Sequence, residues 1–482
     1  MKFAVLAVAS ECVPLVKTGG LADVVGALPG ALAAHGVAVT TLLPGYPAVM
    51  QAVGGARAAR VMPELFGGPA RIVPASVEGL DLLVLDAPHL FARRGNPYQD
   101  ASGAEWGDNG VRFAGLGAAA GFIAGGGLPG RKFAAVHAHD WQAGLAPAYL
   151  RFAKSPVPSL FTIHNLAFQG KFPATLFPRL GLPPESFATA GLEYYGGVGF
   201  MKAALWFADR INTVSPSYAT EIMTPQFGMG LDGLLRGRHR DVSGIVNGID
   251  TDAWNPATDP QLAAHYDAAD LAPRGANRAA LRAELGLAED AKGPLFAFIG
   301  RLTWQKGIDL VLESIPAITE AMGQLAILGT GERGLEERCR GAAAANPGRI
   351  ASFIGFNERL AHLTYGGADA VLVPSRFEPC GLTQLCSLRY GALPIVARTG
   401  GLSDTVIDAN PAALAAGTGT GFMAAPDNVA MLAQAIRRAA EAWRDGATWQ
   451  RLQANAMASD VSWQRSAALY AALLREMTEA RA

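Results

Sequence analysis

The sequence predicts an α/β fold built from two doubly wound domains. Short apolar runs alternate with longer segments of helical periodicity along most of the chain, a pattern typical of βαβ units and parallel sheets. The chain has 482 residues, whereas single hydrophobic cores stop growing at roughly 250–300 residues. Half of the residues are hydrophobic and 17% are charged, so the chain can form two cores and disorder is not expected.

Apolar runs predict six strands in the first half of the chain and five in the second, with helices such as 141–153 between them. A polar stretch at 241–260, rich in Asp, Gly and Pro, separates the two sets and marks the domain boundary. Residues 461–482 have apolar residues at helical spacing and predict a terminal amphipathic helix that belongs to neither sheet. The predicted strands are 2–9, 37–44, 80–87, 133–139, 159–164, 211–215, 294–302, 324–329, 351–356, 369–375 and 393–398.

Composition argues against several partners and compartments. The 40 Lys and Arg residues nearly balance the 41 Asp and Glu residues, so we expect neither nucleic acid nor an anionic membrane as a partner. The four cysteines show no C-x-x-C pair and no zinc-ligand spacing, which favours a reducing cytoplasmic location. The apolar run at 2–9 is short for a signal peptide. The uncharged segment 113–130 is mostly Gly and Ala and predicts a closely packed helix, not a membrane span.

The loop after the first predicted strand has the sequence Lys17-Thr18-Gly19-Gly20-Leu21-Ala22-Asp23. Its two glycines permit close backbone approach, and a helix that opens at Leu21 offers free N–H groups to an anion, beside the charge of Lys17. The alternative is a plain glycine turn. The loop does not match G-x-G-x-x-G, and the second strand ends without the acid that holds a ribose, so binding of a nicotinamide dinucleotide is disfavoured.

Polar residues end two further strands of the first half. One strand ends in His137-Ala138-His139-Asp140, and the next ends in His164-Asn165. Groups at neighbouring strand ends suit the many hydroxyls of a sugar, because ligands of open α/β sheets bind at that edge. His137, His139 and Asp140 could instead be metal ligands, but a His-x-His on a strand is more often one exposed histidine and one whose hydrogen bonds are satisfied within the fold.

Two loops of the second half suit a sugar diphosphate. Arg301 and Lys306 follow a predicted strand on a strand-to-helix connection, and such cations bind phosphate oxygens. The segment 375–384 follows another strand and opens a helix, with Glu378 placed to accept hydrogen bonds from hydroxyls. Each loop alone could be a surface charge or a helix cap. Four such loops, all after strands, favour a nucleotide sugar site.

These motifs together resemble bacterial glycogen synthase. The resemblance rests on KTGGLADVVGALP, HAHDWQ, TIHNLAFQG, VNGIDTDAWNP, RLTWQKGIDL, SRFEPCGLTQL and ARTGGLSDTV, which occur in the family's order from Lys17 onward. It implies a GT-B fold, with two Rossmann-like domains that face a cleft and a terminal helix that crosses back to the first domain. It also implies an acceptor domain at 1–243, a donor domain at 244–460 and a terminal helix at 461–482 that packs on the first domain.

The resemblance also implies roles for individual residues. Lys17 matches the lysine that binds the donor, His164 the histidine near the transferred glucose, and Asp140 the carboxylate implicated in catalysis. Arg301 and Lys306 match the pair that binds the diphosphate, and Glu378 belongs to the segment that contacts glucose. The remaining residues implied to bind substrate are Gly19, Gly20, Asp23, Asn165, Phe356, Cys380, Gly381, Leu382 and Thr383.

The chain departs from the family pattern at two positions. Phe356 stands where relatives commonly have a tyrosine that stacks on the base; stacking survives this change, but a hydroxyl contact does not. Cys386 stands where related enzymes commonly have Glu or Tyr. No role can be carried over to Cys386.

The implied reaction is transfer of glucose, with retention of configuration, from ADP-glucose to the 4-hydroxyl of glycogen or a maltooligosaccharide. UDP-glucose remains the alternative donor. Rival functions are a sucrose- or trehalose-phosphate type transferase on the same fold and a non-catalytic glucan-binding protein. We predict no cofactor and no metal, and we interpret the D-x-D pattern at 250–252 as turn chemistry.

Overall fold

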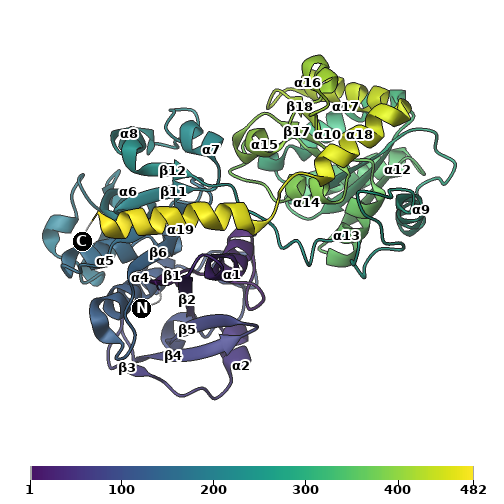
Figure 1. Ribbon diagram of the computed structural model, residues 1–482. Helices are drawn as coiled ribbons and strands as arrows, with labels where there is room; N and C mark the ends of the chain where they lie inside the picture. Colours follow the sequence, from purple (N-terminus) through teal and green to yellow (C-terminus); the bar gives the residue numbers. More distant parts are fainter. Residues whose placement is uncertain (1–2, 481–482) are drawn as a thin grey trace. The chain divides into compact units, whose positions relative to one another are not determined.

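The computed structural model describes residues 3–480, which form two compact units. Among the described residues, unit 1 comprises 3–247 and 463–480, and unit 2 comprises 248–462. Residue 2 of the first predicted strand and residues 481–482 of the predicted terminal helix lie outside the described residues. The chain leaves unit 1 after β12, and it returns with α19, which is drawn in yellow beside the unit 1 elements (Figure 1).

Unit 1 contains a nine-stranded sheet in the order β12-β11-β7-β6-β1-β2-β5-β4-β3. All neighbours pair in parallel except β5 with β4 and β4 with β3. A small antiparallel sheet, β8-β10-β9, lies outside it. The strands are β1 (Phe3–Val8), β2 (Val37–Pro44), β3 (Arg60–Met62), β4 (Ala70–Val77), β5 (Leu80–Asp86), β6 (Ala135–His139), β7 (Ser159–Ile163), β8 (Lys171–Pro173), β9 (Glu193–Tyr194), β10 (Gly197–Gly199), β11 (Arg210–Thr213) and β12 (Val242–Gly244).

Helices cover the large sheet of unit 1. Helices α1 and α19 contact each other, while α4, α5 and α6 form a separate contacting group. The α-helices are α1 (Gly20–Ala33), α2 (Pro47–Val53), α3 (Pro88–Phe91), α4 (Asn109–Phe122), α5 (Ala146–Phe152), α6 (Phe200–Phe207), α7 (Pro216–Glu221), α8 (Asp232–Gly237) and α19 (Trp463–Glu479). A π-helical turn η1 (Ile123–Gly127) follows α4, and 3-10 turns occur at η2 (Trp141–Ala143), η3 (Ala174–Arg179), η4 (Pro184–Ser186) and η5 (His239–Asp241).

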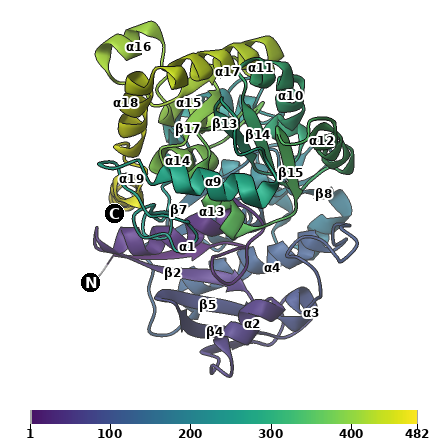
Figure 2. The ribbon, with the colours of Figure 1, turned by 90° about the vertical axis from the view of Figure 1, so that its right-hand side faces the viewer.

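Unit 2 contains a six-stranded parallel sheet in the order β15-β14-β13-β16-β17-β18. Helices α10, α11, α12 and α17 lie together, and α9, α13 and α14 lie on the other side of the strands (Figure 2). The strands are β13 (Leu295–Ile299), β14 (Gln324–Gly329), β15 (Ile350–Ile354), β16 (Ala370–Val373), β17 (Leu393–Ala397) and β18 (Phe422–Ala424). The helices are α9 (Arg274–Leu285), η6 (Trp304–Lys306), α10 (Ile308–Glu313), α11 (Ile315–Glu320), α12 (Arg333–Ala345), α13 (Glu358–Gly367), α14 (Thr383–Arg389), α15 (Gly400–Thr405), α16 (Pro411–Ala416), α17 (Val429–Arg444) and α18 (Gly446–Met457).

Central strands carry unbroken apolar runs because helices cover both of their faces. All five residues of β7 and all five of β17 are buried, as expected for parallel strands. The Gly-rich helix α4 is buried along most of its length. A Cβ added to Gly121 would lie 2.9 Å from the Cβ of Tyr149 on α5, so glycine allows the two helices to pack closely. In the part of the chain that the structure describes, no helix has the length and apolarity needed to cross a membrane.

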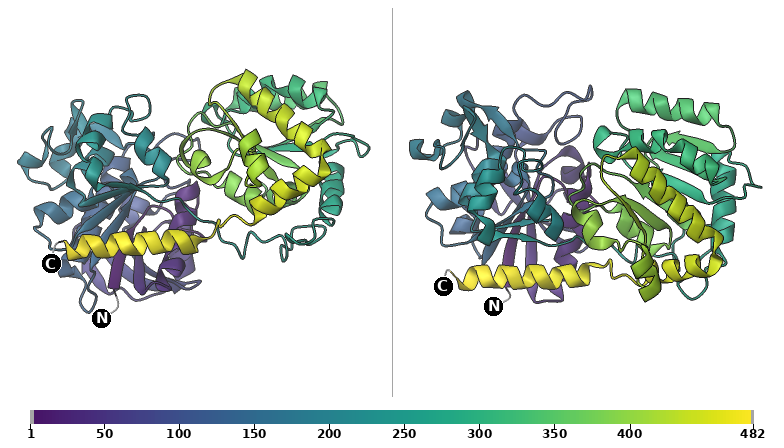
Figure 3. Two further views of the ribbon diagram at one scale, coloured as in Figure 1. Left: turned by 45° about the horizontal axis from the view of Figure 1, so that its top comes forward. Right: turned by 90° about the horizontal axis from the view of Figure 1, so that it is seen from above.

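The terminal helix α19 packs on unit 1. Tyr470 and Leu474 of α19 are fully buried in a cluster with residues of α1 and β1, and both views in Figure 3 draw the helix along that unit. The units divide at 247/248 and 462/463, a few residues beyond the boundaries predicted from the sequence. The first division lies later because β12 pairs with β11 and Ile245 joins the α19 cluster.

Some predicted elements differ in detail. The predicted helix 141–153 is a 3-10 turn and a separate helix, α5, because Gly144 packs against backbone: a Cβ there would lie 2.6 Å from the carbonyl oxygen of Phe200. The predicted strand 211–215 ends at Thr213, since Ser215 caps α7 by accepting a hydrogen bond from the Tyr218 N–H. The short or antiparallel strands β3, β4, β8–β10, β12 and β18 were not predicted.

Candidate active site

Each large sheet has one point at which the strand order reverses, and most of the predicted site residues follow the strands on either side of it; His164 and Asn165 follow β7, one strand further along. In unit 1 this point lies between β1 and β6, and in unit 2 between β13 and β16. Open α/β sheets bind ligands at the carboxyl ends of strands at such points. We describe the two sets of loops separately.

A buried carboxylate organises the loop after β1. Glu11 is 2% exposed; it accepts hydrogen bonds from the Thr18 hydroxyl at 2.6 Å, the Gly19 N–H at 3.3 Å, the Thr18 N–H and the Tyr98 hydroxyl. These bonds fix the backbone immediately before α1. A Cβ built on Gly19 would meet no atom within 4 Å, so the space beside this glycine is open to a ligand.

Lys17 and Asp23 form an ion pair on the exposed side of this loop. The Lys17 Nζ lies 2.7 Å from the Asp23 Oδ1, and the lysine side chain is 49% exposed. Exposed pairs of this kind contribute little to stability, about 0–1 kcal/mol. Lys17 can therefore exchange Asp23 for a phosphate oxygen at small cost to the fold.

Asp140 lies at the end of β6 in a strained and buried position. Its φ is +55°, which is uncommon for a residue other than glycine and is often associated with functional sites. Its Oδ1 accepts the His164 N–H at 2.7 Å and the Asn165 N–H at 3.4 Å. Burial raises the pKa of Asp140 to about 7, against the lowering effect of these two N–H groups. The carboxylate thus ties the end of β6 to the end of β7 and titrates near neutrality.

Three histidines beside Asp140 are uncharged; His137 and His139 are buried, and His164 is partly buried. The His139 Nδ1 lies 3.0 Å from the His164 Nε2, and the His137 Nε2 lies 2.7 Å from the Thr162 hydroxyl. Burial lowers the pKa of His137 and of His164 to about 3, and it lowers the pKa of His139 well below its usual range. His164 therefore acts as a neutral hydrogen-bonding group whose tautomer is coupled to that of His139.

In unit 2, Lys306 and Glu378 join the loops after β13 and β16. The Lys306 Nζ lies 2.5 Å from the Glu378 Oε2, which also accepts a hydrogen bond from the Ser375 hydroxyl at 2.8 Å. Glu378 is buried. Arg301 is exposed, and its guanidinium reaches the Gln305 Oε1 at 3.5 Å. Lys306 is thus held in place by a carboxylate, whereas the structure gives no acidic partner for Arg301 among the described residues.

Arg376 fastens the same two loops together. Its guanidinium donates two hydrogen bonds to Asp309, at 2.9 and 2.7 Å, and one to the Trp304 carbonyl at 2.6 Å. The hydrogen bonds with Asp309 raise the pKa of Arg376. A bidentate pair of this kind fixes geometry as well as charge, so the segment that carries Glu378 is held against the segment that carries Lys306.

The segment after Glu378 is shaped by glycines. Gly381 has φ +78°, and a Cβ there would lie 2.3 Å from the Gln384 Oε1; the N-terminus of α14 at Thr383 follows directly. A Cβ on Gly401 would lie 2.2 Å from the Cys380 carbonyl oxygen. The turn at 398–401 therefore packs directly on the turn at 378–381. Cys386 is buried in the hydrophobic core of unit 2, which gives this position a packing role.

Phe356 lies apart from these groups. It follows β15, the edge strand of the sheet, and is 82% exposed. The next residue, Asn357, caps helix α13 by accepting a hydrogen bond from the Leu360 N–H. The exposed ring is free to stack on a planar ligand, and its position does not place it in contact with Glu378 or Lys306.

The D-x-D segment forms a turn. The Asp250 Oδ1 accepts the Asp252 N–H at 2.9 Å and the Ala253 N–H at 3.1 Å. This is an Asx turn, as predicted from the sequence. Within residues 3–480, no group of three or more His, Cys, Asp or Glu side chains is arranged to hold a metal ion.

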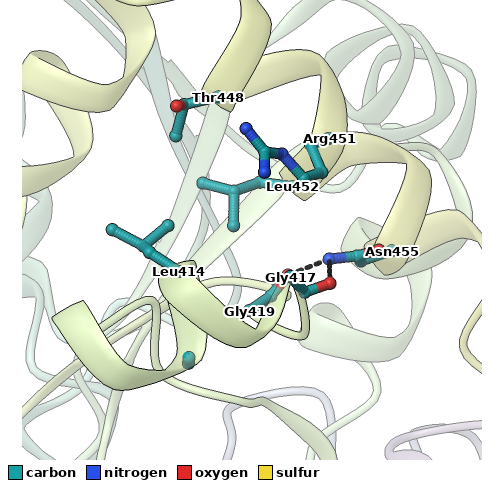
Figure 4. A pocket seen from close by; sticks show the side chains of 8 residues that line it. Leu414, Gly417, Gly419, Thr448, Arg451, Leu452 and Asn455 are labelled. Atoms are coloured by element: carbon teal, nitrogen blue, oxygen red, sulfur yellow. Dashed lines mark hydrogen bonds between the residues drawn. The ribbon is translucent and has the colours of Figure 1, made fainter.

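Two surface hollows lie away from the strand-end loops. One, of about 30 Å³, lies between α16 and α18 in unit 2, where the Asn455 amide donates to the carbonyls of Gly417 and Gly419 (Figure 4). The other, of about 460 Å³, lies in unit 1 at the start of β7 near Ser159 and Lys154, at the opposite end of the strand from His164. Neither contains a predicted site residue.

Comparison with known proteins identifies the family. Residues 4–237 match the starch synthase catalytic domain family, and residues 280–456 match the glycosyl transferases group 1 family. A glycogen synthase of Rhodopseudomonas palustris (strain BisA53) is 55% identical over 477 residues, covering 99% of this chain and 98% of the relative. The chain belongs to the glycogen synthase family. A glycogen synthase of Acidiphilium cryptum (strain JF-5) is 56% identical over 475 residues, covering 98% of this chain and 99% of the relative.

Solved structures agree with this assignment. The catalytic domain of starch synthase IV from Arabidopsis thaliana, bound to ADP and acarbose, has a TM-score of 0.88 and 31% identity, and the match covers 99% of this chain and 100% of that chain. A sucrose-phosphate synthase from Thermosynechococcus elongatus has a TM-score of 0.60 at 19% identity and shares the fold alone. The predicted GT-B fold and the predicted family are therefore confirmed, and this glycogen synthase family member is a glycosyltransferase.

Several residues that shape the site were not predicted. Glu11, Tyr98, Ser375 and Arg376 act through contacts between loops that are far apart in sequence, such as the 87 positions between Glu11 and Tyr98. His139 was placed among the polar groups that suit a sugar, with metal binding as the alternative, but its contact with His164 was not predicted. The one available signal for these residues was a charged side chain shortly after a strand, as in Glu11 and Arg376. Such a signal does not reveal which residue the side chain contacts.

Proposed function

We propose that this enzyme transfers glucose from ADP-glucose to the 4-hydroxyl at the non-reducing end of an α-1,4-glucan, with retention of the α configuration. The observation that carries the proposal is the pair of cations after β13, with Lys306 held by the buried Glu378 and Arg301 left exposed. The starch synthase IV structure, at 31% identity, was solved with ADP and acarbose, which supports an adenine nucleotide and a glucan-like ligand. Glycogen or a maltooligosaccharide is the proposed acceptor.

In this proposal, unit 2 stabilises the leaving diphosphate. Cleavage of the glycosyl phosphate bond develops positive charge on the sugar ring and negative charge on the departing oxygen. Arg301 and Lys306 offset that negative charge, and one well-placed donor typically contributes about 3–4 kcal/mol to lowering such a barrier. Glu378 orients Lys306 and accepts hydrogen bonds from glucose hydroxyls. The Gly381, Leu382 and Thr383 backbone contacts glucose and phosphate, with Cys380 beside it, and Phe356 stacks on the base.

Unit 1 supplies the remaining groups. Lys17, beside Gly19, Gly20 and Asp23, binds the donor, and the neutral His164 donates a hydrogen bond to the transferred glucose, with Asn165 beside it. Ionised Asp140 stabilises the positive charge that develops on the sugar. The acceptor hydroxyl attacks from the face that the diphosphate leaves, which retains the configuration.

A donor comparison tests the proposal. The enzyme is incubated with glycogen and either ADP-glucose or UDP-glucose, and release of the nucleoside diphosphate and incorporation of glucose are both measured. We expect ADP-glucose to give the higher kcat/KM and the new linkages to be α-1,4. Higher kcat/KM with UDP-glucose would contradict the donor assignment. Transfer to fructose phosphate in place of maltooligosaccharide would contradict the acceptor assignment.

Replacing Lys17 with alanine is expected to raise the donor KM by about tenfold, the size of a lost charge-assisted contact of about 1.4 kcal/mol. The turnover number should change less, because a contact made equally in ground and transition states affects KM. Steady-state kinetics with varied ADP-glucose check this. Lys154→Ala is the matched control, since Lys154 is exposed in the loop before β7. An unaltered donor KM in the Lys17 variant would contradict donor binding by this loop.

Removing divalent cations is expected to leave transferase activity intact. Arg301 and Lys306 supply the charge that a divalent ion would otherwise provide on the diphosphate, and the D-x-D acid Asp250 is engaged in a turn. Assays in excess EDTA, and with Asp252→Ala, should give nearly full turnover. Activity that EDTA abolishes and magnesium or manganese restores would refute both the role of the cation pair and the assignment of the turn.

A further inference from the structure

A tyrosine occupies an unfavourable position in the small sheet of unit 1. Strands β9 and β10 are joined by the two-residue turn Tyr195–Gly196, in which both residues have positive φ, +48° and +76°. A hairpin turn of this kind is type I′, and it strongly favours Asn, Asp or Gly at its first position. Tyrosine is disfavoured there because its Cβ crowds the backbone. Local turn chemistry therefore does not account for Tyr195.

Burial does not account for Tyr195 either, although its ring meets that of Tyr194 edge-on at 4.7 Å between centroids. Its side chain is 74% exposed, whereas its neighbour Tyr194 is 8% exposed. The same turn type occurs between β4 and β5 at Glu78–Gly79, with φ values of +48° and +82°, and its first position holds an exposed charged residue. The Tyr195 ring thus adds strain and exposed apolar surface without burying itself, which points to a contact with a ligand.

The surroundings of Tyr195 form a small amphipathic surface, which we call the tyrosine patch: Lys171, Tyr194, Tyr195, Met229 and Gly230. The Lys171 Nζ lies 5.1 Å from the centre of the Tyr195 ring and 5.4 Å from that of Tyr194. Glycine at position 230 lets the backbone approach Tyr194 closely, because a Cβ there would lie 2.8 Å from the Tyr194 hydroxyl. A flat ring flanked by an ammonium group suits a pyranose, whose C–H face stacks on aromatic rings while its hydroxyls need hydrogen-bond partners.

The tyrosine patch continues from the loop after β7. The Gln169 amide and the Tyr194 hydroxyl both donate hydrogen bonds to the Met229 carbonyl, at 3.1 and 3.2 Å. Gln169 lies five positions after His164 in the same loop, and Phe168 beside it is 52% exposed. The strand β8 (Lys171–Pro173), which begins the sheet that carries the patch, is labelled in Figure 2. One connected stretch of chain therefore runs from the candidate active site to the patch.

We propose that the tyrosine patch binds an α-1,4-glucan acceptor at glucose units beyond the non-reducing end. The inference rests on the proposed function for the identity of the acceptor. A chain that reacts near His164 reaches the patch only when it is several glucose units long. The patch therefore favours long acceptors over short ones and has little effect on a trisaccharide.

Three variants test this inference with maltoheptaose and maltotriose as acceptors. Tyr195→Asn removes the ring but installs a residue that the type I′ turn favours, so the fold should be at least as stable. We expect its kcat/KM to fall about five- to tenfold with maltoheptaose and to change less than twofold with maltotriose. Tyr195→Phe keeps the ring and should retain the wild-type preference for the longer acceptor. Glu78→Asn installs the same residue at the first position of the matching turn. It should leave kcat/KM unchanged with both acceptors.

Calorimetric titration with maltoheptaose separates this inference from the proposed function. Weaker binding of maltoheptaose by Tyr195→Asn than by the wild type and Glu78→Asn supports the tyrosine patch as a glucan site. This result would hold even if the protein transferred no glucose, and in that case only the proposed function would fail. Equal binding by all three proteins, or an unchanged maltoheptaose-to-maltotriose ratio in Tyr195→Asn, would overturn the inference.

Discussion

Replacing Glu378 with glutamine is expected to lower turnover by roughly 10²-fold or more while the fold remains intact. The Glu378 carboxylate holds the Lys306 ammonium at 2.5 Å and accepts the Ser375 hydroxyl at 2.8 Å. An amide of the same shape accepts weaker hydrogen bonds and carries no charge, so Lys306 would lose its fixed position beside the proposed diphosphate site. Loss of one preorganised donor commonly costs 10²–10³ in turnover.

The measurement is kcat with saturating ADP-glucose and glycogen, together with the circular dichroism spectrum of the variant. Glu337→Gln is the matched control, because Glu337 is exposed in the same unit and forms an ion pair along helix α12 with Arg333. This control should retain wild-type turnover. If Glu378→Gln retained it as well, Glu378 could be neither a contact for glucose nor the residue that orients Lys306.

The parts of the fold that follow periodicity could be predicted from the sequence. Central parallel strands such as β2 and β14 are continuous apolar runs, and the structure places them at the predicted residues, Val37–Pro44 and Gln324–Gly329. Strands β3 and β4 were missed. Edge and antiparallel strands are partly exposed, as Arg60 and Arg71 are, and their short, mixed patterns resemble loops.

The sequence was enough to predict which loops carry the candidate site residues, but not which of their side chains contact one another. Parallel strands bring their carboxyl ends to one edge, so the proximity of Asp140 to His164 follows from the order of β6 and β7. The pairing of Lys306 with Glu378 spans 72 positions, and no periodicity encodes it. The φ of +55° at Asp140 depends on how the end of β6 packs, which single-sequence reasoning does not reach.

Asp140→Asn is expected to lower turnover by roughly 10²-fold or more and, at the same time, to stabilise the fold above neutral pH. The proposed role of Asp140 needs a negative charge beside the developing positive charge of the sugar, and asparagine removes it. The stabilisation has a separate origin. Burial raises the pKa of Asp140 to about 7, from the ordinary aspartate value of 3.8. The carboxyl group therefore ionises less readily in the folded protein than in the unfolded chain.

The sign of the pH dependence follows from this difference. Below the unfolded pKa, Asp140 is protonated in both states, and the two proteins should have similar stability. As pH rises from about 4 to about 7, the unfolded chain loses the proton first, so the free energy of unfolding of the wild type falls relative to that of the variant. Above pH 7 the difference is constant. Asparagine can still accept the N–H groups of His164 and Asn165 through its Oδ1, so the variant keeps these contacts.

Thermal unfolding at several pH values and the pH dependence of kcat/KM test the two effects together. The melting temperature of Asp140→Asn should exceed that of the wild type by an amount that grows between about pH 4 and pH 7. Each kcal/mol of difference in the free energy of unfolding should shift the melting temperature by roughly 2–4 °C. The wild-type kcat/KM should rise with one deprotonation near pH 7, and the variant should lack this limb. A variant with normal turnover would refute the catalytic role. A variant that is less stable at pH 8 would instead show that the Asp140 carboxylate is stabilised by its surroundings, against the effect of burial.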